Sequence, residues 1–183
     1  MNSWTEIRYK TLIVPIVVGV FLLFIPLLGD FHIESALLVS LAGCFWAAMR
    51  SSGHSSDRSD FWDALQLAGY LFLIGLPLLI NALITGCFSI HGLGFWLIFP
   101  LLSVYFGYAI GRLFRLWEVP YPRFISVLIL LSVSIGLFLF ELLNYPQVYF
   151  FNHIWGGWPG PIYDEVVKVS GSAVFFRSLT VLW

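Results

Sequence analysis

Hydrophobic residues run along this chain in long blocks, and polar residues gather in short intervals between the blocks. A helix needs about 20 mostly apolar residues to cross a hydrocarbon layer of about 30 Å. Blocks of that length, within normal tilt, cover about residues 11–28, 31–49, 65–88, 93–110 and 124–143. We therefore expect an all-α integral membrane protein with five transmembrane helices in an antiparallel bundle, and a sixth if the last apolar block also crosses.

The interruptions within and between these blocks fit that expectation. Pro77 and Pro100 fall inside apolar blocks, where neighbouring helices can satisfy the freed carbonyls, so they predict kinks and not breaks. The interval 50–61 is the most soluble-looking stretch of the chain. Its Ser59, followed by Asp60 and Asp63, is typical of an N-cap with acidic residues in the first helical turn. A solvated turn and a cap account for this interval.

Composition supports lipid as the solvent. Of the 183 residues, 60% are hydrophobic and 10% are charged, whereas a soluble domain carries about 25% charged residues. So few charges exclude an ordinary soluble enzyme, a nucleic-acid-binding protein and a disordered chain. The net charge of −1 names no partner, and the two cysteines, Cys44 and Cys87, are too few for a disulfide framework or a structural zinc site.

The distribution of basic residues predicts the orientation, because Lys and Arg collect in cytoplasmic loops. The segments before, between and after the five predicted spans fall on alternating sides of the membrane. One side has a single basic residue, Lys168, and the other has seven: Arg8, Lys10, Arg50, Arg58, Arg112, Arg115 and Arg123. We predict a cytoplasmic N-terminus and an extracytoplasmic segment 144–170. Trp and Tyr residues at both predicted boundaries agree with interfacial belts. A bacterial inner membrane is the expected location, with the lipid bilayer and other membrane polypeptides as partners.

The predicted outer segment 144–170 holds the most distinctive sequence. Gly156-Gly157 and Pro159-Gly160-Pro161 exclude a continuous helix or a central strand. The segment is nevertheless too aromatic for a solvated loop, so we expect an irregular ribbon on the outer membrane surface or on the helix bundle. Large rigid aromatic side chains dominate binding energy when they are buried in a partner. The candidate partner contacts are Trp155, Trp158 and Tyr163; an interfacial aromatic belt is the alternative interpretation.

Polar residues of the predicted outer face form a second candidate cluster, which consists of His32, Glu34, His91, Glu141, His153, Asp164 and Glu165. Imidazole and carboxylate groups can bind zinc or iron. No pair has the spacing of a helical metal motif such as H-E-x-x-H, and no nucleophile motif or phosphate-binding loop is visible. We therefore expect interfacial or capping roles, with no metal, cofactor or catalytic residue in this chain. Glu141 is expected to reach the outer interface or to bond Asn81.

Two small residues near the inner end of the fourth predicted span, Gly107 and Gly111, form a G-x-x-x-G pattern. Such a pattern lets helix backbones approach closely. The sequence leaves open whether the neighbouring helix belongs to this chain or to another subunit.

The chain divides into a five-span domain, 1–143, the outer segment, 144–170, and a last apolar stretch, 171–183. As a helix this stretch would measure about 20 Å, which is short of a full crossing. Arg177 in its middle would cost about 2.5–3.5 kcal/mol at the bilayer centre. It forms an interfacial helix or begins a further span or domain; the abrupt apolar end favours a chain that continues beyond Trp183.

Three functions fit these observations. The first is a non-catalytic membrane protein or membrane domain that anchors or assembles a membrane complex through its outer aromatic segment. The second is the N-terminal membrane domain of a longer enzyme whose extracytoplasmic hydrolase domain follows residue 183. The third is a handler of a lipid or a lipophilic carrier. Nearly all mid-span residues are apolar, so a transport path for polar solutes is not expected.

Overall fold

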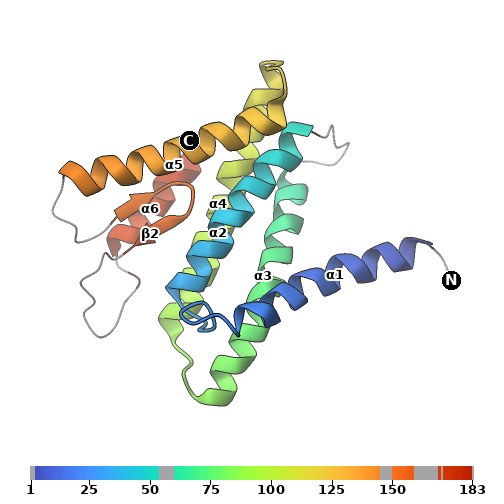
Figure 1. Cartoon of the computed structure of the whole chain (residues 1–183), viewed down its shortest axis with the longest axis vertical. Helices are drawn as coiled ribbons and strands as arrows, with labels where there is room; N and C mark the ends of the chain where they lie inside the picture. Colours follow the sequence, from blue (N-terminus) through green and yellow to red (C-terminus); the bar gives the residue numbers. More distant parts are fainter. Residues whose placement is uncertain (1–2, 54–59, 145–149, 159–168, 170, 183) are drawn as a thin grey trace.

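The structure is a computed structural model, which describes residues 3–53, 60–144, 150–158, 169 and 171–182. Side chains are described for residues 12–53, 61–144, 152–157, 169 and 171–180. Within these ranges the fold is nearly all helical (Figure 1), with six helices and one two-stranded sheet. The elements are α1 Ser3–Leu22, α2 Ile33–Gly53, α3 Asp60–Thr85, α4 Ile90–Leu116, α5 Pro122–Asn144, β1 Phe150–Asn152, β2 Gly156–Trp158 and α6 Gly171–Leu182.

Four of these helices are long and apolar enough to cross a membrane: Ile33–Gly53, Phe61–Thr85, Ile90–Leu116 and Pro122–Asn144. They correspond to the second to fifth predicted spans, so the chain has the character of a multi-pass integral membrane protein. Pro77 and Pro100 lie inside α3 and α4, which continue through them. The first predicted span, 11–28, falls only partly on α1: the helix ends at Leu22, residues 23–28 form turns, and the described apolar part of the helix is Leu12–Leu22. A fifth crossing therefore stays a prediction.

Helices α2 and α4 form the centre of the fold, and small residues bring them together. A side chain at Gly107 would collide with the backbone carbonyl of Cys44, and one at Gly111 would collide with the carbonyl of Ala48. Ala47, Ala48 and Cys44 of α2 are completely buried. The G-x-x-x-G pattern thus packs α4 on α2 of the same chain, which answers the question that the sequence left open.

Aromatic and polar contacts extend this centre to the beginning of α2. Trp96 of α4 stacks on Phe31, with ring centroids 5.3 Å apart. Its indole Nε1 donates a hydrogen bond to the hydroxyl of Ser35 at 3.3 Å. The Ser35 hydroxyl in turn donates to the carbonyl of Asp30 at 2.7 Å. The turn before α2 is therefore fixed to α4.

The two ends of the α2–α4 pair differ in chemistry. We call one the histidine end, because it carries His32 and His91, and the other the arginine end, because it carries Arg50, Arg112, Arg115 and Arg123. Ser89 caps α4 at the histidine end by accepting a 3.2 Å hydrogen bond from the amide of His91. At the arginine end, Arg123 of α5 donates a 3.1 Å hydrogen bond to the carbonyl of Gly53, the last residue of α2.

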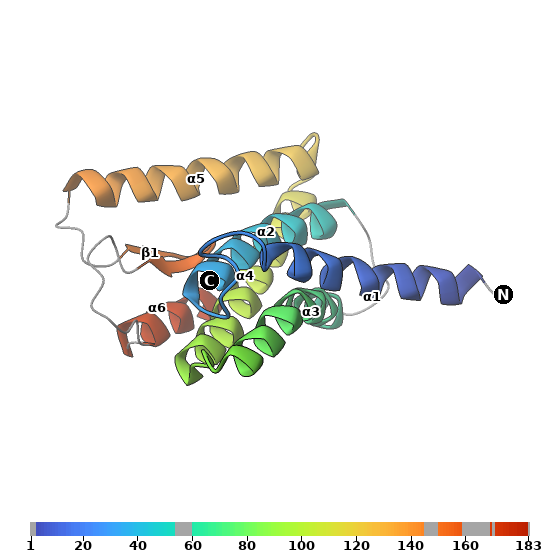
Figure 2. The same ribbon diagram turned by 60° about the horizontal axis from the view of Figure 1, so that its bottom comes forward.

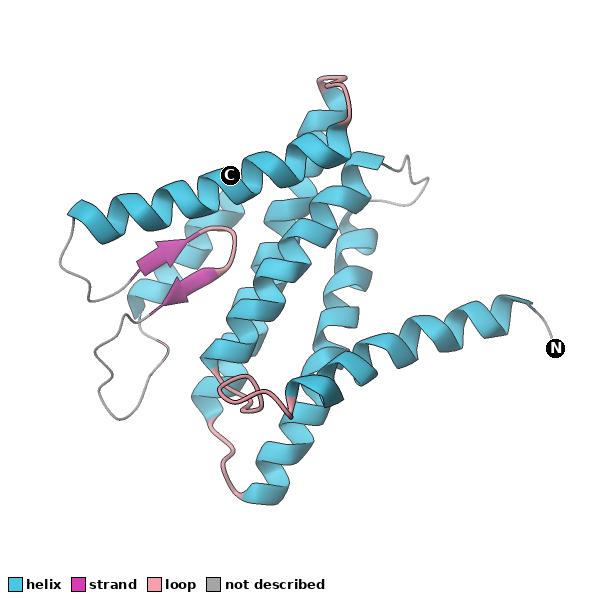
Figure 3. Ribbon diagram, viewed as in Figure 1, coloured by secondary structure: helices cyan, strands magenta, loops and turns pink. Residues whose placement is uncertain are grey.

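Helices α1 and α5 lie at the edges of the fold. Helix α1 contacts α3 and then projects away from the other helices toward the N-terminus (Figure 1). Helix α5 starts beside the end of α2 and is separated from α6 by the two strands (Figure 2). The strands, magenta in Figure 3, therefore lie among helices that include two membrane-length ones, α2 and α5.

Candidate functional site

The central feature of the site is a short hairpin in the segment that follows α5. Strands β1 and β2 pair in antiparallel register, with Asn152 opposite Gly156, and residues 153–155 make the reversal. Gly156 has a φ of +121°, which side-chain-bearing residues rarely adopt. A Cβ atom there would also press on the ring of Phe99 in α4. The glycine therefore permits both the reversal and the close approach to α4.

Polar contacts fix the hairpin to α5. The indole Nε1 of Trp155 donates a 3.1 Å hydrogen bond to the hydroxyl of Ser134. The amide of Asn152, a buried side chain, donates to the carbonyl of Ser134 at 3.5 Å, and its oxygen accepts a 2.8 Å hydrogen bond from the amide of Ile154. Ser134 is about halfway along α5. The hairpin thus reaches the level of the middle of a membrane-length helix.

Arg177 of α6 connects the hairpin to α4. Its Nη2 donates 2.7 Å hydrogen bonds to the carbonyl of Phe99 and to the hydroxyl of Ser103. Its Nη1 donates to the carbonyl of His153 at 2.9 Å and to that of Asn152 at 3.5 Å. Phe99 and Ser103 lie near the middle of α4. One guanidinium therefore joins three elements, α4, α6 and the hairpin, near the middle of α4.

Arg177 is buried among uncharged hydrogen-bond acceptors. Its side chain is 1% exposed, and each hydrogen-bond acceptor around it is a carbonyl or a hydroxyl. The guanidinium also lies 5.6 Å from the centre of the Phe99 ring. Nε is buried and has no hydrogen-bond partner among the described residues. Several oriented carbonyl dipoles, and no carboxylate, thus stabilise this charge in the described part of the chain.

The ring of His153 completes the contact between the hairpin and α6. Its Nδ1 lies 2.9 Å from the hydroxyl of Thr180. The ring stacks on Phe176 at a centroid distance of 4.3 Å, and Phe106 of α4 lies 6.0 Å away. Ile154 packs in a buried cluster with Cys44 of α2. The hairpin is thus embedded among α2, α4, α5 and α6.

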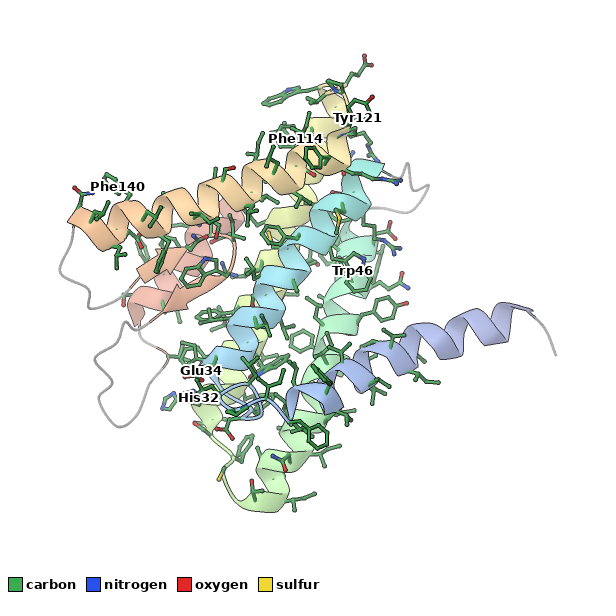
Figure 4. All side chains as sticks on the ribbon, in the orientation of Figure 1. His32, Glu34, Trp46, Phe114, Tyr121 and Phe140 are labelled. Carbon is green, nitrogen blue, oxygen red and sulfur yellow. The ribbon has the colours of Figure 1, made fainter. Side chains whose placement is uncertain are left out.

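The predicted polar cluster is distributed over different places. His32 and Glu34 do come together, with Nδ1 and Oε2 3.4 Å apart, and Figure 4 shows both at the start of α2. They line a cavity of about 280 Å³ with Asp30, Asn81 and Cys87.

Of the other members of that cluster, His91 lies in the first turn of α4, at the same histidine end as His32 and Glu34. Glu141 lies near the end of α5 and His153 lies in the hairpin, away from that end. Asp164 and Glu165 fall outside the described residues. Within the ranges that the structure describes, no three His, Cys, Asp or Glu side chains are grouped to hold a metal ion.

The structure describes the three aromatic residues that were predicted to contact a partner to different extents. Trp155 is half-buried between α2 and α5, where it packs against both buried clusters. The backbone of Trp158 pairs with Phe150 in the sheet. The side chain of Trp158 and all of Tyr163 lie outside the described parts. Sequence reasoning missed Ser134, Asn152 and Ser103 as partners in this site; their polar character within apolar surroundings was the available signal.

Comparisons with known proteins add no further assignment. A scan against protein-family models, a search of curated proteins and a search of solved structures each found no match.

Proposed function

We propose that this chain is a non-catalytic membrane domain that anchors or assembles a membrane complex through the segment 144–170. The observation that carries the proposal is the anchoring of this segment on both sides. The hairpin on one side is hydrogen-bonded to α5 and to Arg177 of α6, and on the other side Val169 packs against the α2–α4 core, just before α6. A segment held at both ends loses less conformational entropy when it binds a partner, which favours affinity.

The partner contacts in this proposal are Trp158 and Tyr163, with Trp155 holding the segment to the bundle. The hydrogen bond from Trp155 to Ser134 restrains the strand that leads to Trp158. Asp164 and Glu165 follow directly and would supply a polar rim, as interfaces commonly have around an aromatic centre. Other membrane polypeptides are the proposed partners.

The proposed membrane arrangement has five crossings in an antiparallel bundle, with a cytoplasmic N-terminus in a bacterial inner membrane. Exposed apolar side chains along α1 support the additional crossing, among them Val14 (61% exposed) and Phe21 (64% exposed). Contiguous apolar surface of this kind is stable against lipid and costly in water. The excess of arginine at one end of the fold supports the orientation.

Site-specific photo-crosslinking in native membranes tests the proposal. A photoreactive phenylalanine analogue at Trp158 or Tyr163 should give a polypeptide adduct of discrete mass. The same analogue at Phe24, which is 79% exposed at the histidine end, is the matched control and should give lipid adducts. Because an interface hot spot contributes about 2 kcal/mol or more, Trp158→Ala should reduce partner co-purification by about tenfold or more. Lipid adducts alone at 158 and 163 would contradict the proposal.

A further inference from the structure

A cavity at the arginine end has the chemistry of a binding site that is separate from the hairpin. It measures about 500 Å³ and is lined by Trp46, Met49 and Arg50 of α2 and by Arg123 of α5. This volume lies within the range of about 300–1,000 Å³ that is typical of small-molecule sites. Figure 4 shows Trp46 on the half of α2 that is nearer to Tyr121, away from His32 and Glu34. Two helices therefore contribute to one cavity near one end of the membrane-length segments.

The two arginines make this cavity positively charged. Among the residues whose side chains the structure describes, no acidic one lines the cavity, and neither arginine forms an ion pair. Arg123 uses Nη2 for its hydrogen bond to the carbonyl of Gly53, which orients the guanidinium. A guanidinium has five N–H donors in a planar fork. The pair can therefore present several donors to one anionic group, for which phosphate oxygens have the matching geometry.

The remaining lining is apolar and lies toward the middle of α2. Trp46 precedes Arg50 by about one helical turn. The ring of Trp46, which lines the cavity, stacks against Tyr70 of α3 at a centroid distance of 6.4 Å and is thereby supported by α3. Trp46 and Met49 are 40% and 42% exposed. A molecule bound here would meet cationic groups at the helix ends and apolar surface toward the centre.

We infer that this cavity binds an anionic phospholipid of the membrane leaflet at the arginine end. The phosphate diester would bind Arg50 and Arg123, and an acyl chain would run along Trp46 and Met49 toward the middle of the membrane. Basic pockets between transmembrane helices are a recurrent way to bind anionic lipid head groups. A soluble phosphate would satisfy the arginines but would leave the apolar wall unpartnered.

Lipid binding can be measured on the purified full chain in mild detergent. Phosphatidylglycerol should raise the thermal unfolding temperature and remain bound in native mass spectrometry, whereas phosphatidylcholine at the same mole fraction should do neither. Charge-assisted hydrogen bonds contribute enough for each Arg→Gln change to weaken phosphatidylglycerol binding by about tenfold or more. The variants are Arg50→Gln, Arg123→Gln and their combination.

Controls separate a defined site from general charge attraction. Arg8→Gln with Lys10→Gln removes the same charge from the same predicted side of the membrane and should leave binding unchanged. An equal loss of phosphatidylglycerol binding in this control would overturn the inference. So would a finding that the unmodified protein does not prefer phosphatidylglycerol over phosphatidylcholine. Stabilisation by inorganic phosphate alone would also overturn it, because the ligand would then be a soluble anion. The comparison of phosphatidylglycerol with phosphatidylcholine uses the unmodified chain, so its result does not depend on whether a variant folds.

Discussion

Replacing Arg177 by methionine should lower the free energy of unfolding by about 2–5 kcal/mol. The change removes the donors that the carbonyl of His153 and the hydroxyl of Ser103 use. The Ser103 hydroxyl stays buried and the His153 carbonyl partly buried in the contact between α4 and the hairpin, and an unpaired buried polar group costs about 1–3 kcal/mol. Thermal unfolding in detergent measures the loss of stability. Hydrogen exchange of the backbone amides should increase first in residues 150–158.

Arg177→Lys is the matched control for charge. An ammonium keeps the positive charge but lacks the planar fork that reaches α4 and the hairpin together. We therefore expect Arg177→Lys to be more stable than Arg177→Met and less stable than the unmodified chain. If Arg177→Met unfolds at the same temperature as the unmodified chain, apolar packing alone holds the hairpin and the role assigned to the guanidinium is wrong.

Replacing Gly107 by leucine should disrupt the packing of α2 on α4. The nearest atom to a new side chain is the backbone carbonyl of Cys44, which cannot move without displacing α2. Overpacking of a core costs about 1–3 kcal/mol even where side chains can adjust, and a backbone collision costs more. The yield of monodisperse protein in mild detergent, together with the unfolding temperature, measures the effect.

Gly69→Leu is the matched control for this substitution. Gly69 lies inside α3, and no atom lies within 4 Å of the position that its Cβ would occupy. Leucine is also a better helix former than glycine, so we expect this variant to keep the yield and unfolding temperature of the unmodified chain. If Gly69→Leu and Gly107→Leu lose similar amounts of yield and unfolding temperature, the Gly107→Leu substitution acts through general folding and not through the contact with α2.

The membrane-length helices could be predicted from the sequence, because the length of an apolar run is set by the thickness of the bilayer. The predicted run 93–110 falls inside α4, which extends to Ile90 and Leu116. Beyond the apolar run the helix continues through Arg112 and Arg115 to its C-cap, where the amide of Trp117 donates a 3.0 Å hydrogen bond to the carbonyl of Leu113. Hydropathy reports the part of a helix that suits lipid, and capping residues such as Ser89 set its actual beginning.

The site was less accessible to sequence reasoning, because its contacts join residues far apart in the chain. The partners of Arg177 lie 24 and 78 residues away, at His153 and Phe99. An arginine within an apolar stretch predicts a cost of burial, but no feature of the sequence indicates which carbonyls accept hydrogen bonds from its guanidinium. The residue types in a sequence do not reveal which backbone carbonyls make tertiary contacts. The distinctive glycines, in contrast, did predict a non-helical segment at 156–157, and Gly156 has the positive φ that such a turn requires.

The accessibility of a cysteine at Ile154 measures whether the hairpin is embedded among the helices near the middle of α4 and α5. Ile154 is 1% exposed, whereas the natural Cys87 is exposed at the histidine end and serves as an internal positive control. Cys44 is replaced by alanine. A membrane-impermeant maleimide, applied to either face of native membranes, should label Cys87 and leave Ile154→Cys unlabelled. Labelling of Ile154→Cys as fast as Cys87 would contradict the account.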